Sequence, residues 1–266
     1  MANPNAMFIP KAFSLAHARS MFAGSDPVKL ALLSDLLDFD YGGFKDEFVQ
    51  ALDTNRWTAA VTAGGGPTAF AYSAVRGGVI QGQTGATDND ATAIHLAQTF
   101  LDPADMPFML IQWRSNAVTG FSFEIGFSDP KTDEALPGVT DVDTPATGNG
   151  VTDIACIHMD TDQTLTTAAF VGDGTTGAAT SLSNPEGAGS SYTPTASAWQ
   201  TFIIGVRPNL AFAHVWDGAG FAGTFSVGNG PDSGVLVRPY ALFRTRNTVN
   251  KTIDIRKIRV GWEQNG

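Results

Sequence analysis

Near the end of the chain, VRPYALFRTR at residues 237–246 is followed, after a short polar turn, by TIDIRKIRVGW at residues 252–262. Both segments alternate apolar with charged residues, and a period of two is typical of a half-buried strand. Adjacent strands of this kind predict an antiparallel sheet with one dry face and one solvated face. We therefore expect a β-sandwich.

The second of these segments breaks its own alternation once. Ile255 and Ile258 are three positions apart, so the inward register slips around Arg256 and Lys257. An extra residue in one strand of a pair is a β-bulge, and a bulge bends the strand that carries it. We predict a bent closing strand.

From residue 41 onward the chain consists of short β-rich segments separated by Gly, Asp, Asn, Pro and Thr. Many short strands between turn residues favour a large two-sheet jelly roll. The predicted strands cover residues 57–61, 68–74, 79–83, 92–100, 108–115, 120–128, 153–160, 164–172, 199–207, 210–217, 220–225, 237–245 and 252–262. Two long loops rich in Gly, Thr, Ser and Asp, at residues 129–150 and 172–198, separate the middle strands, and loops of this length are often functional.

Residues 1–40 have a different character. Asp26 followed by Pro27 is typical of a helix N-cap with proline at the first helical position, and DPVKLALLSDLLDF has helical apolar spacing. We predict an arm with a short helix at residues 1–40 and a sandwich domain at residues 41–266. The arm either packs on its own sandwich or reaches a neighbouring subunit. Its candidate partner-binding residues are Phe8, Ile9, Phe13 and Phe22.

Charge limits the possible partners. The formal net charge is -10 and charged residues make up 16% of the chain, whereas nucleic-acid binding needs clustered Lys and Arg. The few basic residues gather late, with Arg244 and Arg246 among them. They form a solvated strand face, meet acidic neighbours, or provide a docking surface for an acidic partner.

Cysteine usage and hydropathy point to an intracellular assembly route. Cys156 is the only cysteine, so no disulfide framework exists, and its apolar surroundings favour a small buried group over a nucleophile. No apolar run is long enough to span a bilayer. The first residues, MANPNAMFIPKAF, lack a basic start followed by an apolar segment, so we expect no export signal.

Four segments carry a resemblance to a known family. They are KDEFVQALDTNRWTAAV at residues 45–61, GGVIQGQTGATDNDATAIH at 77–95, WQTFIIGVRPNLAFAHVWDG at 199–218 and RPYALFRTRNTVNKTIDIRKIRVGW at 238–262. In their order they resemble the concanavalin A-like, laminin G-like jelly rolls of bacteriophage virion proteins. The resemblance covers residues 44–263.

This resemblance implies a non-enzymatic structural protein on the outside of a virion. A capsid decoration or cement protein fits best, assembled in the host cytoplasm and bound to the major capsid protein or another virion protein. A homo-oligomer, such as a trimer, is expected. The alternative is a carbohydrate-binding module or a head or tail fibre protein that recognises host glycans, because the same fold also includes lectins and glucanases.

The residues argue against catalysis. Glucanases of this fold use paired carboxylates two or four positions apart on one strand, but in GFSFEIGFSDP Glu124 has no second acid at either spacing. His95, His158 and His214 each stand in a predicted strand, His17 lies in the arm, and no GxSxG motif accompanies them. We expect structural histidines and no catalytic residue.

A metal site is the remaining candidate, and no other cofactor is expected. TGATDND brings Asp88, Asn89 and Asp90 into one turn, and Asp160 and Asp162 repeat a similar spacing. Calcium needs six to eight oxygen ligands, more than these acids supply alone. Asp and Asn also form turns without metal, so both interpretations stay open.

Tryptophan could provide a sugar-binding platform, since its large ring packs well against apolar surfaces. The candidates fall within or beside predicted strands, where alternation favours core packing. They are Trp57, Trp113, Trp199, Trp216 and Trp262.

Overall fold

The structure is a computed structural model that describes residues 41–48, 51–64, 66–73, 78–141, 146–162, 168–173, 180–183, 192–217 and 220–263. These residues belong to one compact unit, Asp40–Gly266. The helix predicted at residues 26–37 and the apolar arm residues Phe8, Ile9, Phe13 and Phe22 lie outside the described residues.

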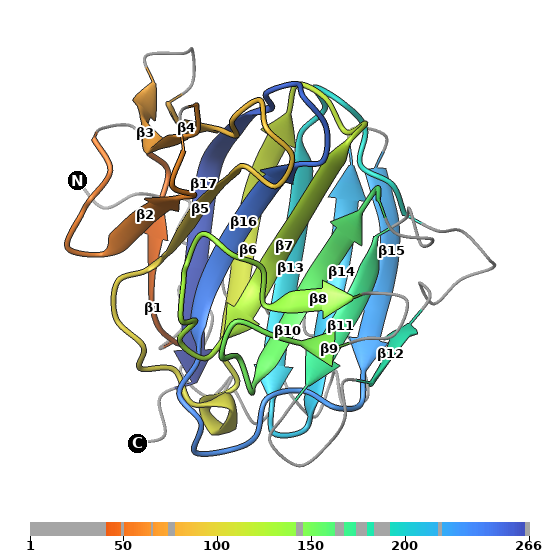
Figure 1. Cartoon of the computed structure of the whole chain (residues 1–266). Helices are drawn as coiled ribbons and strands as arrows, with labels where there is room; N and C mark the ends of the chain where they lie inside the picture. Colours follow the sequence, from red (N-terminus) through yellow and green to blue (C-terminus); the bar gives the residue numbers. More distant parts are fainter. Residues whose placement is uncertain are drawn as a thin grey trace, which may run out of the picture. The chain divides into compact units, whose positions relative to one another are not determined.

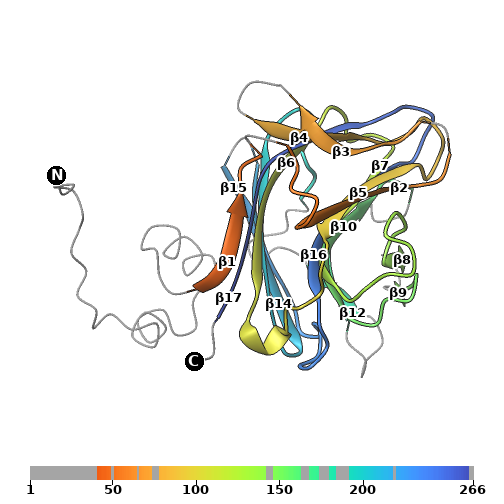
Figure 2. The same cartoon turned by 90° about the vertical axis from the view of Figure 1, so that its left-hand side faces the viewer.

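Two antiparallel sheets pack face to face, which confirms the predicted β-sandwich (Figures 1 and 2). Sheet A runs in the order β15, β14, β13, β6, β17, β4, β3, and β1 pairs with the part of β17 beyond β4. Its strands are β1 (Tyr41–Asp46), β3 (Thr68–Ser73), β4 (Val79–Gln83), β6 (Phe108–Ser115), β13 (Gln200–Arg207), β14 (Leu210–Asp217), β15 (Gly220–Val227) and β17 (Thr252–Glu263).

Sheet B runs in the order β12, β11, β10, β7, β16, β5, β2. Its strands are β2 (Trp57–Val61), β5 (Ala91–Leu96), β7 (Phe121–Ser128), β10 (Ile154–Asp160), β11 (Ala169–Asp173), β12 (Thr180–Ser183) and β16 (Arg238–Thr245). A small hairpin of β8 (Val139–Asp141) and β9 (Ala146–Thr147) stands apart from both sheets, and a short 3-10 helix, η1 (Pro103–Asp105), precedes β6.

The two strands that suggested the sandwich lie in opposite sheets. β16 belongs to sheet B and β17 to sheet A, so the prediction that they share one sheet is wrong. The predicted bulge is confirmed, because the pairing of β17 with β6 shifts between Ile255 and Lys257. The bulge puts Ile255 and Ile258 on the inner face despite their odd spacing.

Aromatic rings fill the space between the sheets. Trp113 of β6 lies at the centre, with ring centroids 5.1 Å from Phe123, 5.2 Å from Phe243 and 5.5 Å from Phe202. These rings come from both sheets and are fully buried. Aromatic contacts at this range add about 0.5–1.5 kcal/mol each beyond area burial, so this cluster ties the two layers together.

Sheet B has a second buried surface on its outer side. Every residue of β16 is buried, so this strand lacks the solvated face that its sequence predicts. Tyr240 and Leu242 of β16 pack in a separate apolar cluster with Val139 and Val151 from the segment around the β8–β9 hairpin. We call residues 129–141 and 146–153 the covering segment. In Figures 1 and 2 its hairpin lies over the outer face of sheet B.

Candidate functional site

Glu124 is the acidic residue that the sequence comparison with the glucanase pattern singled out, and the structure buries it completely. It stands on β7 and points to the outer side of sheet B, under the covering segment. Its carboxylate accepts hydrogen bonds from the N–H groups of Gly138 at 2.9 Å and Val139 at 2.8 Å. Both donors belong to the covering segment, which therefore binds directly to the carboxylate.

Three further side chains complete this site, which we call the Glu124 cluster. Lys131 Nζ lies 3.3 Å from Glu124 Oε2, His158 Nδ1 lies 3.4 Å from Oε1, and the Tyr240 hydroxyl donates to Oε2 at 3.2 Å. The Lys131 ammonium also lies 3.9 Å from the centre of the Tyr240 ring and donates to the Leu136 carbonyl at 3.3 Å. The cation is thus enclosed on several sides.

Burial and pairing compete in setting the ionisation of this cluster. Burial opposes the charge on Glu124, but Lys131, His158 and the Gly138 N–H outweigh it and hold the pKa of Glu124 well below its ordinary range. Burial lowers the pKa of Lys131, and the neighbouring Glu124 carboxylate only partly offsets that shift. Glu124 is therefore a paired anion with no proton to give.

The strand offers no second carboxylate at the spacing that glycoside hydrolysis requires. Two positions after Glu124 stands Gly126, where an added Cβ would collide with the Ala155 carbonyl of β10. Four positions after it stands Ser128, which is buried. Close strand packing at Gly126 therefore leaves no room for an acidic side chain two positions after Glu124.

The strand histidines and the cysteine all lie in the interior of the protein. His95, His158 and His214 are all buried. Burial lowers the pKa of His95 from 6.5 to about 4, which keeps it neutral at physiological pH. Cys156 lies in the apolar cluster beneath the covering segment, where burial raises the pKa of its thiol far above the usual range. A thiol in that state is a poor nucleophile.

The side chains of the Asp88–Asp90 turn interact with arginine side chains. Asn89 has a φ of 71°, and its side-chain oxygen accepts hydrogen bonds from Arg246 and, at 3.5 Å, from Arg244. Asp88 Oδ1 lies 3.7 Å from Arg246 Nη1, and Asp90 accepts from the Thr87 N–H at 3.0 Å. Among the described residues no group of three His, Cys, Asp or Glu side chains could hold a metal.

Arg244 and Arg246, which the sequence marked for partner binding, are engaged within the chain. Arg244 Nη2 lies 3.0 Å from Asp160 Oδ2, and Arg246 Nε lies 2.9 Å from Asp160 Oδ1 and 3.3 Å from Asp162 Oδ2. Arg244 is buried. The acids at Asp160 and Asp162 that suggested a calcium loop are the counter-ions of these two arginines.

The basic residues of sheet A have a different environment. β17 and β6 direct Arg256 and Arg114 away from the core, and both guanidinium groups stack on Trp199, with Cζ atoms 4.5 Å and 4.7 Å from its ring centre. Arg114 also pairs with Asp254 at 2.7 Å. On the same face Arg207 stacks on Phe212 and Arg259 on Phe108. We call this surface the arginine–aromatic face.

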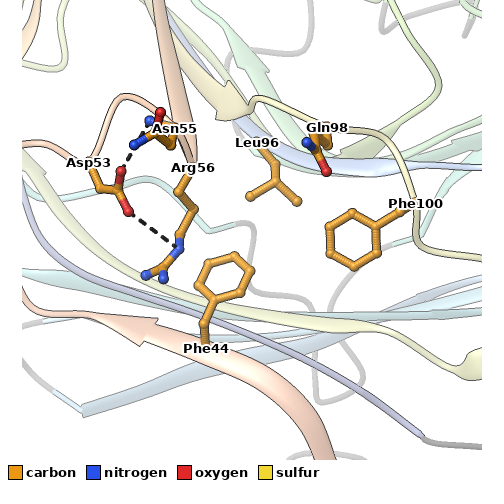
Figure 3. A pocket seen from close by; sticks show the side chains of 7 residues that line it. All are labelled: Phe44, Asp53, Asn55, Arg56, Leu96, Gln98 and Phe100. Atoms are coloured by element: carbon orange, nitrogen blue, oxygen red, sulfur yellow. Dashed lines mark hydrogen bonds and ion pairs between the residues drawn. The ribbon is translucent and has the colours of Figure 1, made fainter.

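A pocket of about 310 Å³ opens at the edge of the sandwich where β1 and β2 lie (Figure 3). Phe44, Leu96 and Phe100 form its apolar part, and the remaining lining is polar. The polar lining residues are Asp53, Asn55, Arg56 and Gln98. Nothing in the sequence pattern marked this pocket, because its residues come from separate segments that meet only in the fold.

Packing around the pocket holds its aromatic rings in place. Phe100 meets Trp262 edge to face at 5.2 Å, and Phe44 meets Trp57 in the same manner at 5.8 Å. Arg56 lies over the Phe44 ring at 4.7 Å. Two donors, Arg56 Nη1 at 3.0 Å and Trp57 Nε1 at 2.7 Å, converge on one oxygen of the Asp46 carboxylate, which fixes this corner.

No family model matches the chain, and no curated protein matches it by sequence. Solved structures do match its fold. A protein of unknown function from Shewanella oneidensis MR-1 superposes with a TM-score of 0.56 at 12% identity, over 96% of this chain and 96% of that one. Peanut lectin gives 0.56 at 10% identity, over 84% of this chain and 97% of the lectin.

A β-glucanase from Bacillus licheniformis gives a TM-score of 0.52 at 12% identity, over 85% of this chain and 100% of the glucanase. These similarities and the sheet topology show that the chain has an all-β, concanavalin A-like jelly-roll fold. At such low identity they show the fold alone. Among the described residues, no helix is long and apolar enough to cross a membrane.

Proposed function

We propose that this chain is a non-enzymatic docking protein that binds an acidic surface through the arginine–aromatic face of sheet A. The resemblance of its sequence to virion jelly rolls supports a more specific role as a capsid decoration or cement protein of a bacteriophage. The observation that carries the docking function is the gathering of stacked cations on one outer face.

The state of sheet B supports a function without catalysis. The covering segment occupies the outer face of sheet B, and Glu124 is neutralised by Lys131 and fully enclosed. A general acid must reach its substrate and carry a proton at the working pH. Glu124 meets neither condition.

The charge distribution supports an acidic partner. The chain carries a formal net charge of -10, yet Arg114, Arg207, Arg256 and Arg259 share the outer face of sheet A. Stacked guanidinium groups are weakly hydrated and already ordered, so binding costs them little hydration and little conformational entropy. Arginine and tryptophan are also the side chains most enriched at binding hot spots. Complementary charge would speed the encounter and orient it.

Repetition by symmetry would strengthen such docking. Several weak contacts made by a homo-oligomer, such as a trimer, act together through a high effective concentration. The apolar arm at residues 1–40 would add an anchor. Deleting residues 1–40 is expected to leave a folded sandwich that no longer joins its assembly, because the described core lies entirely after residue 40. A truncated protein that still incorporates would remove the anchor from this scheme.

Co-sedimentation with phage capsids stripped of their accessory proteins tests the function. We expect saturable binding that weakens as salt rises and that raises the melting temperature of the capsid. The double variant Arg256→Gln/Arg259→Gln should weaken binding about tenfold. Thr58→Glu, at an exposed position of β2, adds one negative charge away from this face and serves as the control. A chain that ignores capsids, or a control that loses binding equally, would contradict the proposal.

A second candidate is a glycan-binding module, which the similarity of fold to peanut lectin favours. Trp57 and Trp113 are buried, so only the half-buried Trp199, Trp216 and Trp262 could take part. Binding on a glycan array that disappears in Trp199→Ala would support this candidate over capsid docking. Release of reducing sugar from a β-glucan would instead overturn the non-enzymatic assignment.

A further inference from the structure

The pocket at the edge of the sandwich is open to solvent and large enough for a small ligand. Its volume of about 310 Å³ is at the lower end of the range of about 300–1,000 Å³ found for ligand pockets. That size suits one ring-shaped ligand and not an extended chain. The rings that line it are held by Trp57 and Trp262 before any ligand arrives, so binding would cost little reorganisation.

The lining divides into an apolar part and a polar part. Figure 3 shows Phe44, Leu96 and Phe100 converging on the middle of the pocket, with Asp53, Asn55 and Arg56 on one side and Gln98 beside Phe100. Phe100 is 41% exposed, so it presents free surface to a ligand. An aromatic surface next to planar polar groups matches a ligand with one apolar face and hydrogen-bonding edges.

The polar groups also limit the charge of the ligand. Asp53 and Arg56 carry opposite charges, and Arg56 already donates to Asp46. The Asp53 carboxylate accepts the Asn55 N–H at 3.0 Å, which fixes the turn. Asn55 and Gln98 amides offer both donors and acceptors. This balance favours hydroxyl groups, which also donate and accept, over phosphate or ammonium.

We propose that this pocket binds a single uncharged sugar ring. The apolar C–H face of the ring would lie against Phe100 or Phe44, and its hydroxyl groups would meet the side chains of Asp53, Asn55 and Gln98. This site is separate from the arginine–aromatic face and does not depend on docking through sheet A. It places sugar recognition at the edge strands β1 and β2 and not on the covered face of sheet B.

Ligand-observed NMR with single monosaccharides tests the proposal. Glucose, galactose, mannose and N-acetylglucosamine are offered in turn to the full chain, with glucuronate as the charged contrast. We expect at least one neutral sugar to bind, and Phe100→Ala to weaken that sugar about tenfold. Gln98→Ala should weaken it about fivefold. Tyr72→Ala removes an equally exposed aromatic ring (44%) outside the pocket and should leave binding unchanged.

Three results would overturn the assignment. They are the absence of any neutral-sugar signal, a signal that survives in both Phe100→Ala and Gln98→Ala, and an equal loss in Tyr72→Ala. Capsid co-sedimentation of the Phe100→Ala variant separates this site from the docking function. Unchanged co-sedimentation is expected, whereas loss of capsid binding without any sugar signal would show that the pocket takes a protein side chain instead.

Discussion

The outer faces of the two sheets differ in solvent exposure, although their strands have similar sequence patterns. On sheet B the covering segment buries the middle of the outer face, and the charged groups of this sheet are matched inside the protein, as in Glu124 with Lys131 and Arg244 with Asp160. On sheet A the outward arginines stack on aromatic rings and stay partly exposed. Alternation therefore indicates which side chains leave the core but not what they meet outside it.

The difference has an energetic basis. A buried charge needs a partner, because removing an ion from water costs several kcal/mol. A half-exposed arginine keeps much of its hydration and gains about 0.5–1 kcal/mol from an aromatic ring. Substitutions on sheet B should therefore act on stability, whereas substitutions on sheet A should act mainly on binding.

The largest effect is expected from Glu124→Gln. This change keeps the shape but leaves the buried Lys131 ammonium without its counter-ion, which should lower the free energy of unfolding by about 3–5 kcal/mol. Urea unfolding followed by tryptophan fluorescence measures the loss. The double variant Glu124→Gln/Lys131→Met should recover much of it, since no unpaired charge remains. A single variant as stable as the parent would show that the pair contributes nothing.

Low pH should also destabilise the fold, through His95 on sheet B. His95 has a folded pKa of about 4 against 6.5 when exposed, so between these values the unfolded chain binds more protons than the folded one. Through His95, the free energy of unfolding is therefore highest above pH 6.5. It falls as the pH drops towards 4, by up to about 3 kcal/mol.

Thermal melting of the parent and His95→Gln between pH 7 and pH 4 isolates this contribution. The variant should lose less stability over that range than the parent. Glu134, 3.9 Å from His95 Nε2, would pair with a protonated ring. Parallel curves for the two proteins would therefore indicate that this pairing cancels the cost of burial.

A smaller effect is expected for an ion pair on sheet A. Asp254 accepts from Arg114 at 2.8 Å and from Gln81 at 2.8 Å, but the Arg114 side chain is 31% exposed. Asp254→Asn should therefore cost about 1 kcal/mol or less, and added salt should shrink the difference. A cost as large as that of Glu124→Gln would erase the contrast between the two faces.

The smallest effect on stability is expected from Arg256→Gln. Arg256 donates to Gln112 at 2.9 Å and stacks on Trp199 at the surface, so unfolding should change by no more than about 0.5 kcal/mol. The same variant should still weaken capsid binding. Equal losses in stability and binding would mean that the arginine–aromatic face is structural.

Local patterning located most of the larger strands. The bounds of β2, β4, β6 and β14 match the predicted ranges residue for residue, because turn residues flank clear runs of β-formers. β1, β8, β9 and β12 were missed. β1 reads YGGFKD, with two glycines that lower strand propensity, and β8 and β9 have only three and two residues. The assignment of β16 and β17 to one sheet was wrong, because a short connection can also join two consecutive strands that lie in different sheets.

The site was less accessible to sequence reasoning. Lys131 is seven positions from Glu124, but Tyr240 is 116 positions away, and no local period links residues at that separation. The same holds for the pocket, where Phe44 and Phe100 come from different segments. Sequence did indicate the absent carboxylate pair, because that signal depends on spacing within the single strand β7.

The burial of Cys156 makes it a natural reporter of motion. Its thiol lies beneath the covering segment. It can react with a water-soluble disulfide reagent only when the covering segment opens or the whole domain unfolds. Because it is the only sulfhydryl in the chain, the labelling rate needs no background correction. Compared with the global unfolding rate, the labelling rate would tell whether the covering segment opens as an independent unit or only together with the sandwich.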